Sequence, residues 1–175
     1  MRAAPDLRDG ELRLRLLAEG DVDGIERGIR DPDVVRWFGP RGTALDVFEQ
    51  KLREWREGTI VPLAVLEDGS FAGHIFLELL PEQDAALISY WLLPDARGRG
   101  LATRAVRMLT QWAFDVLGTA RIELWLERGN DASRRVADRS GFTYEGTLRS
   151  AGLRDGRRFD KQMFSLLPGD PPPPR

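Results

Sequence analysis

The sequence predicts one domain built on a mixed α/β or α+β sheet. Several short segments alternate apolar and polar residues with the period of two that marks a half-buried strand, and longer segments repeat apolar residues at helical spacing. The dipeptides Asp68-Gly69 and Asp155-Gly156 each separate two strand-like segments, as in antiparallel hairpins. Near the middle of the chain, a glycine-rich turn leads from a strand-like segment into a helix-like one. These observations predict an antiparallel meander that continues as helix, strand and helix.

Three elements are expected before the meander. Residues 11–16 alternate leucine with charged residues and should form a strand. Residues 21–30 are a weaker helix candidate because two glycines interrupt them. Residues 43–57 are a stronger one, in which Thr43 is placed to cap the helix and apolar side chains recur at helical spacing.

The meander itself should contain three strands. Residues 60–67 and 71–80 read as a hairpin, and a third strand that ends at Leu93 follows a turn at 81–84.

The C-terminal half is expected to contain two helices, a strand and a closing hairpin. Asn130 is placed to cap the second helix, whatever else its side chain contacts. The predicted strands are residues 121–127, 143–153 and 158–166, and the helices are residues 101–117 and a short one between Asn130 and Gly141. The apolar face predicted for the first helix consists of Leu101, Ala105, Leu109, Trp112, Ala113 and Val116.

Composition limits the function. The chain has 175 residues, a net charge of −2, one histidine and no cysteine. Without cysteine there is no thiolate metal site and no cysteine nucleophile, and one histidine cannot build a histidine-rich site, so no metal is expected. His74 should be a buried strand residue rather than a member of a catalytic triad. The net charge predicts no nucleic-acid partner.

The domain is expected to span residues 1–167, and the proline-rich residues 168–175 should form an extended or disordered tail. No segment approaches the roughly 18 apolar residues that a membrane-spanning helix needs, and no apolar signal segment follows Arg2. We therefore expect a cytoplasmic protein with no membrane partner.

The turn at residues 94–103 has the features of an anion site. The first backbone N–H groups of the helix that follows lack intrahelical partners and lie at the positive end of the helix dipole. The glycines allow close approach of a ligand, for which a phosphate or pyrophosphate is suited, and Arg97, Arg99 and Arg104 add charge. The turn is not a P-loop, because no Gly-Lys-Ser/Thr follows, and Thr103 stands where a dinucleotide fingerprint has its third glycine.

A third pattern fits this turn. Arg97-Gly-Arg-Gly100-Leu-Ala102 resembles the pyrophosphate loop, Arg/Gln-x-x-Gly-x-Gly/Ala, of the GNAT superfamily of acyl-CoA transferases. Downstream, Asn130-Asp-Ala-Ser133 and Gly141-Phe-Thr-Tyr-Glu-Gly146 resemble the RimJ/RimL-like group of N-acetyltransferases. The resemblance implies the GNAT fold, a mixed and mostly antiparallel central sheet of about seven strands flanked by about four helices.

The resemblance also implies acetyl-CoA as co-substrate and a primary amine as acceptor. The pyrophosphate would accept hydrogen bonds from the turn, the pantetheine arm would lie along the preceding strand and contact Asn130, and Arg134 would bind a CoA phosphate. An amide of Leu92 or Leu93 could polarise the thioester carbonyl. The expected cofactor-binding residues are Leu92, Leu93, Arg97, Gly98, Arg99, Gly100, Leu101, Ala102, Thr103, Asn130, Ser133 and Arg134.

Two residues are candidates for proton transfer. Many GNAT enzymes have a tyrosine at the position of Ala137, so the resemblance gives the role of proton donor to Ser133, whose alternative is an ordinary first-turn serine. Glu78 is the candidate base, because alternation along its strand would turn it toward a cleft. Trp37 and Phe38, expected in a loop, would line the acceptor side.

The acceptor stays open at this point. The RimJ/RimL-like group suggests a protein or peptide α-amine, and the alternative is a small amine such as an aminoglycoside, a polyamine or an amino-acid analogue. A third reading is a catalytically silent domain that only binds CoA. The sequence does not decide between a monomer and a homodimer.

Overall fold

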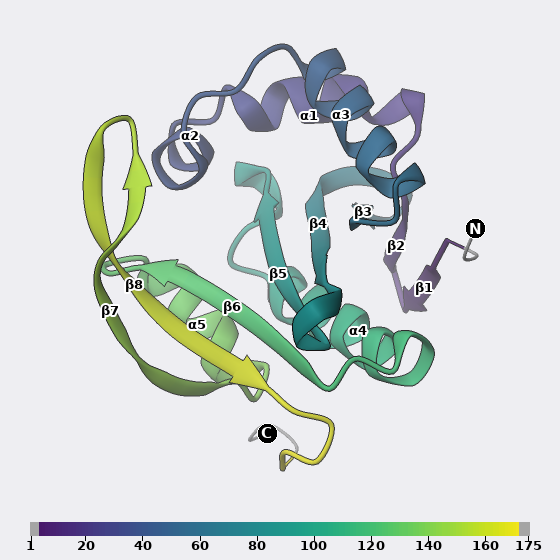
Figure 1. The fold of residues 1–175 in the computed structure, drawn as a ribbon. Helices are drawn as coiled ribbons and strands as arrows, with labels where there is room; N and C mark the ends of the chain where they lie inside the picture. Colours follow the sequence, from purple (N-terminus) through teal and green to yellow (C-terminus); the bar gives the residue numbers. More distant parts are fainter. Residues whose placement is uncertain (1–3, 172–175) are drawn as a thin grey trace.

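The computed structural model describes residues 4–171, which form a single mixed sheet accompanied by helices (Figure 1). Its eight strands lie in the order β1-β2-β3-β4-β5-β6-β8-β7, and every neighbouring pair is antiparallel except β5 and β6. The strands are β1 Asp6–Asp9, β2 Leu12–Leu16, β3 Ile60–Glu67, β4 Ser70–Leu80, β5 Ala85–Leu92, β6 Arg121–Glu127, β7 Thr143–Arg154 and β8 Arg157–Leu166. The end of the predicted tail, residues 172–175, lies outside the described residues.

The α-helices fall into two groups. α1 and α3 pack on each other and on β4 and β3, whereas α4 lies against β5, β1 and β2, and α5 against β6 (Figure 1). They are α1 Val22–Ile29, α2 Pro32–Phe38, α3 Ala44–Arg56, α4 Leu101–Trp112 and α5 Asp131–Arg139. Within residues 4–171, none of the helices has the length and apolar character needed to cross a membrane.

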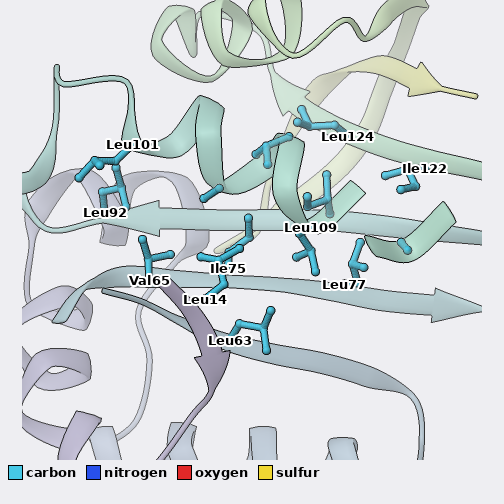
Figure 2. Packing of buried hydrophobic residues seen from close by; sticks show 14 of the residues in the cluster. Leu14, Leu63, Val65, Ile75, Leu77, Leu92, Leu101, Leu109, Ile122 and Leu124 are labelled. Atoms are coloured by element: carbon cyan, nitrogen blue, oxygen red, sulfur yellow. The ribbon is translucent and has the colours of Figure 1, made fainter. Parts of the chain in front are cut away.

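The core has one cluster on each side of the central strands. Leu63 and Val65 of β3 belong to the cluster that includes Leu101 and Leu109 of α4 (Figure 2). The alternate residues of the same strand, Ala64 and Leu66, belong to a second cluster with residues of α1 and α3. Because successive side chains of a strand point to opposite faces, β3 is buried on both sides and the two helix groups cover opposite faces of the sheet.

The mixed, mostly antiparallel sheet and its hairpins are confirmed. The structure has one strand and one helix more than the seven and four expected, and these are β1 and α2. β1 has only four residues and none is buried, so no apolar alternation marks it in the sequence. Val116 was wrongly placed on the buried face of its helix. After Trp112 the chain forms a π-helical turn, Ala113–Leu117, which shifts the side chains around the axis and leaves Val116 61% exposed.

The helix predicted at residues 21–30 also forms, despite its two glycines. A Cβ atom at Gly24 would lie 2.3 Å from the ring of Phe71, and one at Gly28 would lie 2.2 Å from the ring of Trp91. The glycines therefore weaken the intrinsic helix propensity and at the same time allow α1 to pack closely on the aromatic side chains of the sheet.

The parallel pair β5 and β6 is in register only at one end. Ala85–Leu87 pairs with Arg121–Glu123, and no further pairing joins the described residues of the two strands. The rest of β5 and β6 therefore diverges, which leaves an opening in the middle of the sheet.

Candidate active site

Two clefts open where β5 and β6 diverge. The larger, here called the main cleft, has a volume of about 470 Å³ and extends from the strands to the glycine turn and the start of α5. The smaller, the side cleft, has a volume of about 220 Å³ and lies between α2, β6 and the β7–β8 hairpin. The residues that line both are Trp37, Phe38, Tyr90, Asn130 and Ser133. A ligand in each cleft would therefore meet the other at these side chains.

The glycine turn presents free backbone donors to the main cleft. Gly98 and Gly100 have φ angles of 78° and 80°, and a Cβ atom at either position would meet no protein atom within 4 Å. In α4, the first N–H to donate to a carbonyl one turn back is that of Arg104, which donates to Gly100 O at 3.1 Å. The N–H groups of Leu101, Ala102 and Thr103 precede it without an intrahelical acceptor, as an anion site requires.

The edge of β5 presents a second set of free groups. The N–H of Leu93 donates to Ala72 O at 2.9 Å, so the odd-numbered residues of β5 bond to β4. Alternation then directs the N–H and C=O groups of Tyr90 and the N–H of Leu92 to the other side, into the opening. The expectation for Leu92 is consistent with this geometry. That for Leu93 is not, because the Leu93 amide is already bonded and the residue does not line either cleft.

Arg97 lines the main cleft, but its side chain already has partners on the protein. Its Nε donates to Leu92 O at 3.0 Å, and its two terminal nitrogens donate to Asp33 at 2.8 Å and Asp31 at 2.5 Å. Two carboxylates thus neutralise its charge, and the side chain joins the turn to the start of α2.

The other arginines of the turn also have partners on the protein. Arg99 pairs with Glu67, and Arg104 pairs with Asp9 and Glu11 at the β1–β2 hairpin. Neither side chain lines the main cleft. The turn therefore offers a ligand mainly backbone dipoles, because Arg97, its one arginine that lines the main cleft, is already paired with two carboxylates.

α5 brings Ser133 to the junction of the clefts. Asn130 caps this helix by accepting a hydrogen bond from the Ser133 amide at 3.1 Å, as its position predicted. Arg134 does not face the main cleft. Its guanidinium pairs with Asp138 and lies over the rings of Tyr144 and Phe164.

The positive charges of the main cleft come instead from the next residues of α5. Arg135 and Arg139, one helical turn apart, are exposed and line the cleft. The choice between Arg134 and Arg135 depends on which face of α5 packs on the sheet, and the motif alone does not indicate this.

Trp37 and Phe38 line both clefts, but they belong to a helix rather than to a loop. Asp31 caps α2 by accepting from the Val34 amide at 3.1 Å, and Pro32 occupies the first helical turn. This Asp-Pro pair is a helix-start signal that could have identified α2 from the sequence.

Tyr90 is a site residue that sequence reasoning missed. Its ring lines both clefts, whereas its hydroxyl oxygen is closed to solvent and makes no hydrogen bond of standard geometry among the described residues. Burial raises the pKa of the Tyr90 hydroxyl, and the neighbouring hydroxyl of Ser133 lowers it by less. Tyr90 is therefore a protonated phenol at neutral pH.

The side cleft contains one carboxylate, that of Glu127. Burial acts to raise the pKa of Glu127, but hydrogen bonds from Arg157 and Arg154 outweigh it, so the pKa lies below its usual value. Lys161 lines the same cleft with its ammonium 4.1 Å from the ring centre of Trp125, and no carboxylate of residues 4–171 pairs with it. The charged groups around this cleft thus carry a net positive charge.

Glu78 and His74 lie outside both clefts. Glu78 is exposed on β4 and lines neither of them, so the structure does not bring it to Ser133. His74 is buried beside Phe76 and Trp91, and this burial lowers its pKa to about 3. It is the buried strand residue that the sequence predicted.

Sequence relatives of this chain are acetyltransferases by name. A sequence-family model described as an acetyltransferase (GNAT) domain matches residues 11–143. The chain is 37% identical to N-acetyltransferase p20 of Bacillus licheniformis, an otherwise uncharacterised protein, over 89% of this chain and 92% of that one. It is 28% identical to YdaF of Bacillus subtilis, provisionally named a ribosomal N-acetyltransferase, over 89% and 91%. It is 27% identical to spermidine N(1)-acetyltransferase of Escherichia coli over 78% and 75%.

Solved structures of acetyltransferases superpose on this chain over most of its length. A crystal structure of a protein described as a probable acetyltransferase superposes with a TM-score of 0.82 at 28% identity, covering 91% of this chain and 94% of that one. RimJ of Mycobacterium smegmatis, solved with a CoA disulfide, superposes with a TM-score of 0.79 at 25% identity, covering 90% and 82%.

Proposed function

Because the chain belongs to the GNAT acetyltransferase family and is an N-acetyltransferase that uses acetyl-CoA, we propose that its acceptor is the α-amine of a protein or peptide. The amine would attack the thioester directly in a ternary complex. The observation that carries this proposal is the meeting of the two clefts at Ser133. A donor in the main cleft and an acceptor in the side cleft would place their reacting atoms at this side chain.

Acetyl-CoA would occupy the main cleft. Its pyrophosphate fits the free N–H groups from Gly98 to Thr103, and its pantetheine arm fits the free backbone edge of β5 beside Asn130. The guanidinium groups of Arg135 and Arg139 are placed to contact the CoA phosphates.

Ser133 would supply the proton for the leaving group. As the amine nitrogen forms its bond to the carbonyl carbon, the carbon–sulfur bond breaks and leaves the electron pair on sulfur. A thiol has a pKa of about 8.5, so a hydrogen-bond donor at the sulfur assists its departure. Two residues with a hydroxyl group, Ser133 and Tyr90, line both clefts. The oxygen of Tyr90 is closed to solvent, so Ser133 is the candidate donor.

The ionisation of the side cleft favours an α-amine over other primary amines. Its only carboxylate, Glu127, holds two arginines and has a lowered pKa, so it is a poor proton acceptor. The amine must therefore bind as its free base, and the fraction of free base in solution limits the reaction. An α-amine with a pKa near 8 is free base in about one molecule in ten at pH 7, whereas a lysine-like amine with a pKa near 10.4 is free base in about one in 2,500.

The charge of the side cleft also favours a peptide α-amine over a polyamine. A polyamine such as the spermidine of one relative carries several positive charges, and Lys161, Arg154 and Arg157 would repel it. A peptide brings one amine and an uncharged backbone, and it avoids most of this repulsion.

The test is a panel of acceptors incubated with acetyl-CoA. The reaction is measured by the release of the CoA thiol, and the acetylated product is identified by mass spectrometry. The panel compares a lysine-free peptide with a free α-amine, the same peptide with a blocked α-amine and one added lysine, spermidine, and an aminoglycoside. We expect the first peptide to give a kcat/KM at least about tenfold above the others. A preference for spermidine or the aminoglycoside would overturn the α-amine assignment. Acetyl-CoA binding without turnover of any acceptor would indicate the silent CoA-binding domain.

A further inference from the structure

The hydroxyl of Tyr90 is a polar group without a hydrogen-bond partner of standard geometry, on a residue at the junction of the two clefts. The ring lies on β5 and lines both clefts, and its hydroxyl oxygen is buried without a hydrogen bond of standard geometry. A buried hydroxyl left unpaired lowers the stability of the folded protein. Phenylalanine would fill the same space without this cost, so the fold itself gives no reason for a tyrosine at this position.

The surroundings of the hydroxyl indicate what it serves. Its oxygen is closed to solvent, so a ligand in either cleft reaches the ring and not the oxygen. The hydroxyl of Ser133 lies beside it and influences its ionisation. Ser133 also lines both clefts, so it lies between the phenol and the place where the two substrates meet.

We propose that Tyr90 is a positioning residue that acts through Ser133. When acetyl-CoA and the amine are bound, the Tyr90 hydroxyl donates a hydrogen bond to Ser133 Oγ and directs the Ser133 hydrogen toward the thioester sulfur. A rotation of either side chain would complete this bond, because Tyr90 and Ser133 line the same two clefts. The inference rests on the proposed acetyl transfer and on the role of Ser133 in it.

The protons balance along this path. The amine nitrogen bonds to the carbonyl carbon, the carbon–sulfur bond breaks, and the thiolate takes the proton of Ser133. Ser133 takes a proton from the positively charged nitrogen of the new amide, while Tyr90 keeps its own proton and only donates a hydrogen bond to Ser133 Oγ. The products are a neutral amide and the CoA thiol, and both side chains return to their starting state. Because burial keeps the phenol protonated, it acts as a donor throughout the approach of the substrates.

This positioning role predicts an unusual combination of effects for Tyr90→Phe. The variant removes only the oxygen, so kcat should fall about tenfold or more while the KM for acetyl-CoA changes less than about twofold. The melting temperature should stay the same or rise, because an unpaired buried hydroxyl has been removed. If the hydroxyl had only a structural role, its removal would instead lower the melting temperature and leave kcat unchanged.

The control is Tyr144→Phe, which changes the other tyrosine of the chain. The Tyr144 hydroxyl is exposed, bonds to the Thr147 hydroxyl at 2.7 Å and lies outside both clefts. This variant should keep the wild-type kcat.

A double-mutant cycle decides whether Tyr90 acts through Ser133. The kcat of Tyr90→Phe, Ser133→Ala and the double variant is measured with the α-amine peptide and saturating acetyl-CoA. If Tyr90 acts only by positioning Ser133, the double variant should be no slower than Ser133→Ala, because no serine hydroxyl is left for the phenol to direct. Multiplying losses would show that Tyr90 acts independently and would overturn the inference, as would a Tyr90→Phe variant within twofold of the wild-type kcat. Neither result affects the proposed function, which the acceptor panel tests on the wild-type protein.

Discussion

The guanidinium of Arg97 donates to the carboxylate of Asp31, with 2.5 Å between Nη2 and Oδ1, and so joins two segments 66 residues apart in the sequence. Asp31 is also the cap of α2, the helix that carries Trp37 and Phe38 to both clefts. Arg97 follows β5 in the turn that presents the anion site. One side chain therefore links the expected donor site to the expected acceptor site.

Arg97→Ala should impair acceptor binding more than acetyl-CoA binding. It leaves Asp31, whose side chain is only 9% exposed, without its counter-ion, so we expect a loss of about 1–3 kcal/mol of stability and a less ordered α2. The KM for the acceptor should rise severalfold, with a smaller rise for acetyl-CoA. Arg27→Ala is the matched control, because its exposed pair with Asp95 also joins an N-terminal helix to the turn. A large rise in the KM for acetyl-CoA alone would show that Arg97 binds phosphate directly, as the sequence suggested.

Gly100→Ala should weaken acetyl-CoA binding beyond its effect on folding. An alanine at a φ of 80° costs about 1–2 kcal/mol, and its methyl group would enter the space that the turn leaves open for a ligand. Gly69→Ala has a closely similar φ of 79° and an equally open position in the β3–β4 hairpin, away from both clefts.

Thermal melts with and without acetyl-CoA separate the two effects of these substitutions. Both variants should melt below the wild type, but acetyl-CoA should stabilise Gly69→Ala fully and Gly100→Ala much less. Equal stabilisation of the two variants would mean that the turn does not bind the donor.

The arginines of α5 should differ in their effect on acetyl-CoA binding, depending on the face of the helix on which each lies. The double variant Arg135→Ala/Arg139→Ala removes the two guanidinium groups that line the main cleft, so the Kd for acetyl-CoA should rise about tenfold or more. The rise should shrink at high salt, because these charges are exposed. Arg134→Ala should leave the Kd unchanged, since this side chain lies over Tyr144 and Phe164. A greater effect of Arg134→Ala would restore the assignment made from the motif.

His74 should make stability depend on pH just below neutrality. Its folded pKa of about 3 is lower than its ordinary value of 6.5, so between these values the unfolded chain binds one more proton than the folded protein. The free energy of unfolding should therefore fall with decreasing pH by up to about 1.4 kcal/mol per unit below pH 6.5. Because His74 is the single histidine, denaturant titrations at pH 7.5 and 5.5 isolate its effect from that of most carboxylates. His74→Leu should reduce the difference, and an unchanged difference would assign it to other groups.

The sequence predicted those features that depend on local pattern. Alternating residues, the two Asp-Gly turns and the capping residues Thr43 and Asn130 identify most of the elements, since each is encoded within a few positions. The free amides of the glycine turn were predictable for the same reason.

Features that depend on tertiary packing were not predictable in this way. The partners of Arg97 come from a helix more than 60 residues away, and the orientation of Arg134 depends on the rings of β7 and β8 beneath it. The unpaired hydroxyl of Tyr90 results from what surrounds it, and no motif records it. Glu78 followed the alternation of its strand, but alternation does not indicate where along a face the clefts lie.

Comparison of Ser133→Ala with the wild type tests the account most directly. Turnover of the α-amine peptide and the Kd for acetyl-CoA are measured on the same preparations, together with the melting temperature. If Ser133 protonates the departing thiolate where the two clefts meet, kcat should fall about ten- to a thousandfold, while the Kd and the melting temperature barely change. A stable variant with near wild-type kcat would contradict the account, because the junction of the clefts would then not be the place where the acetyl group is transferred.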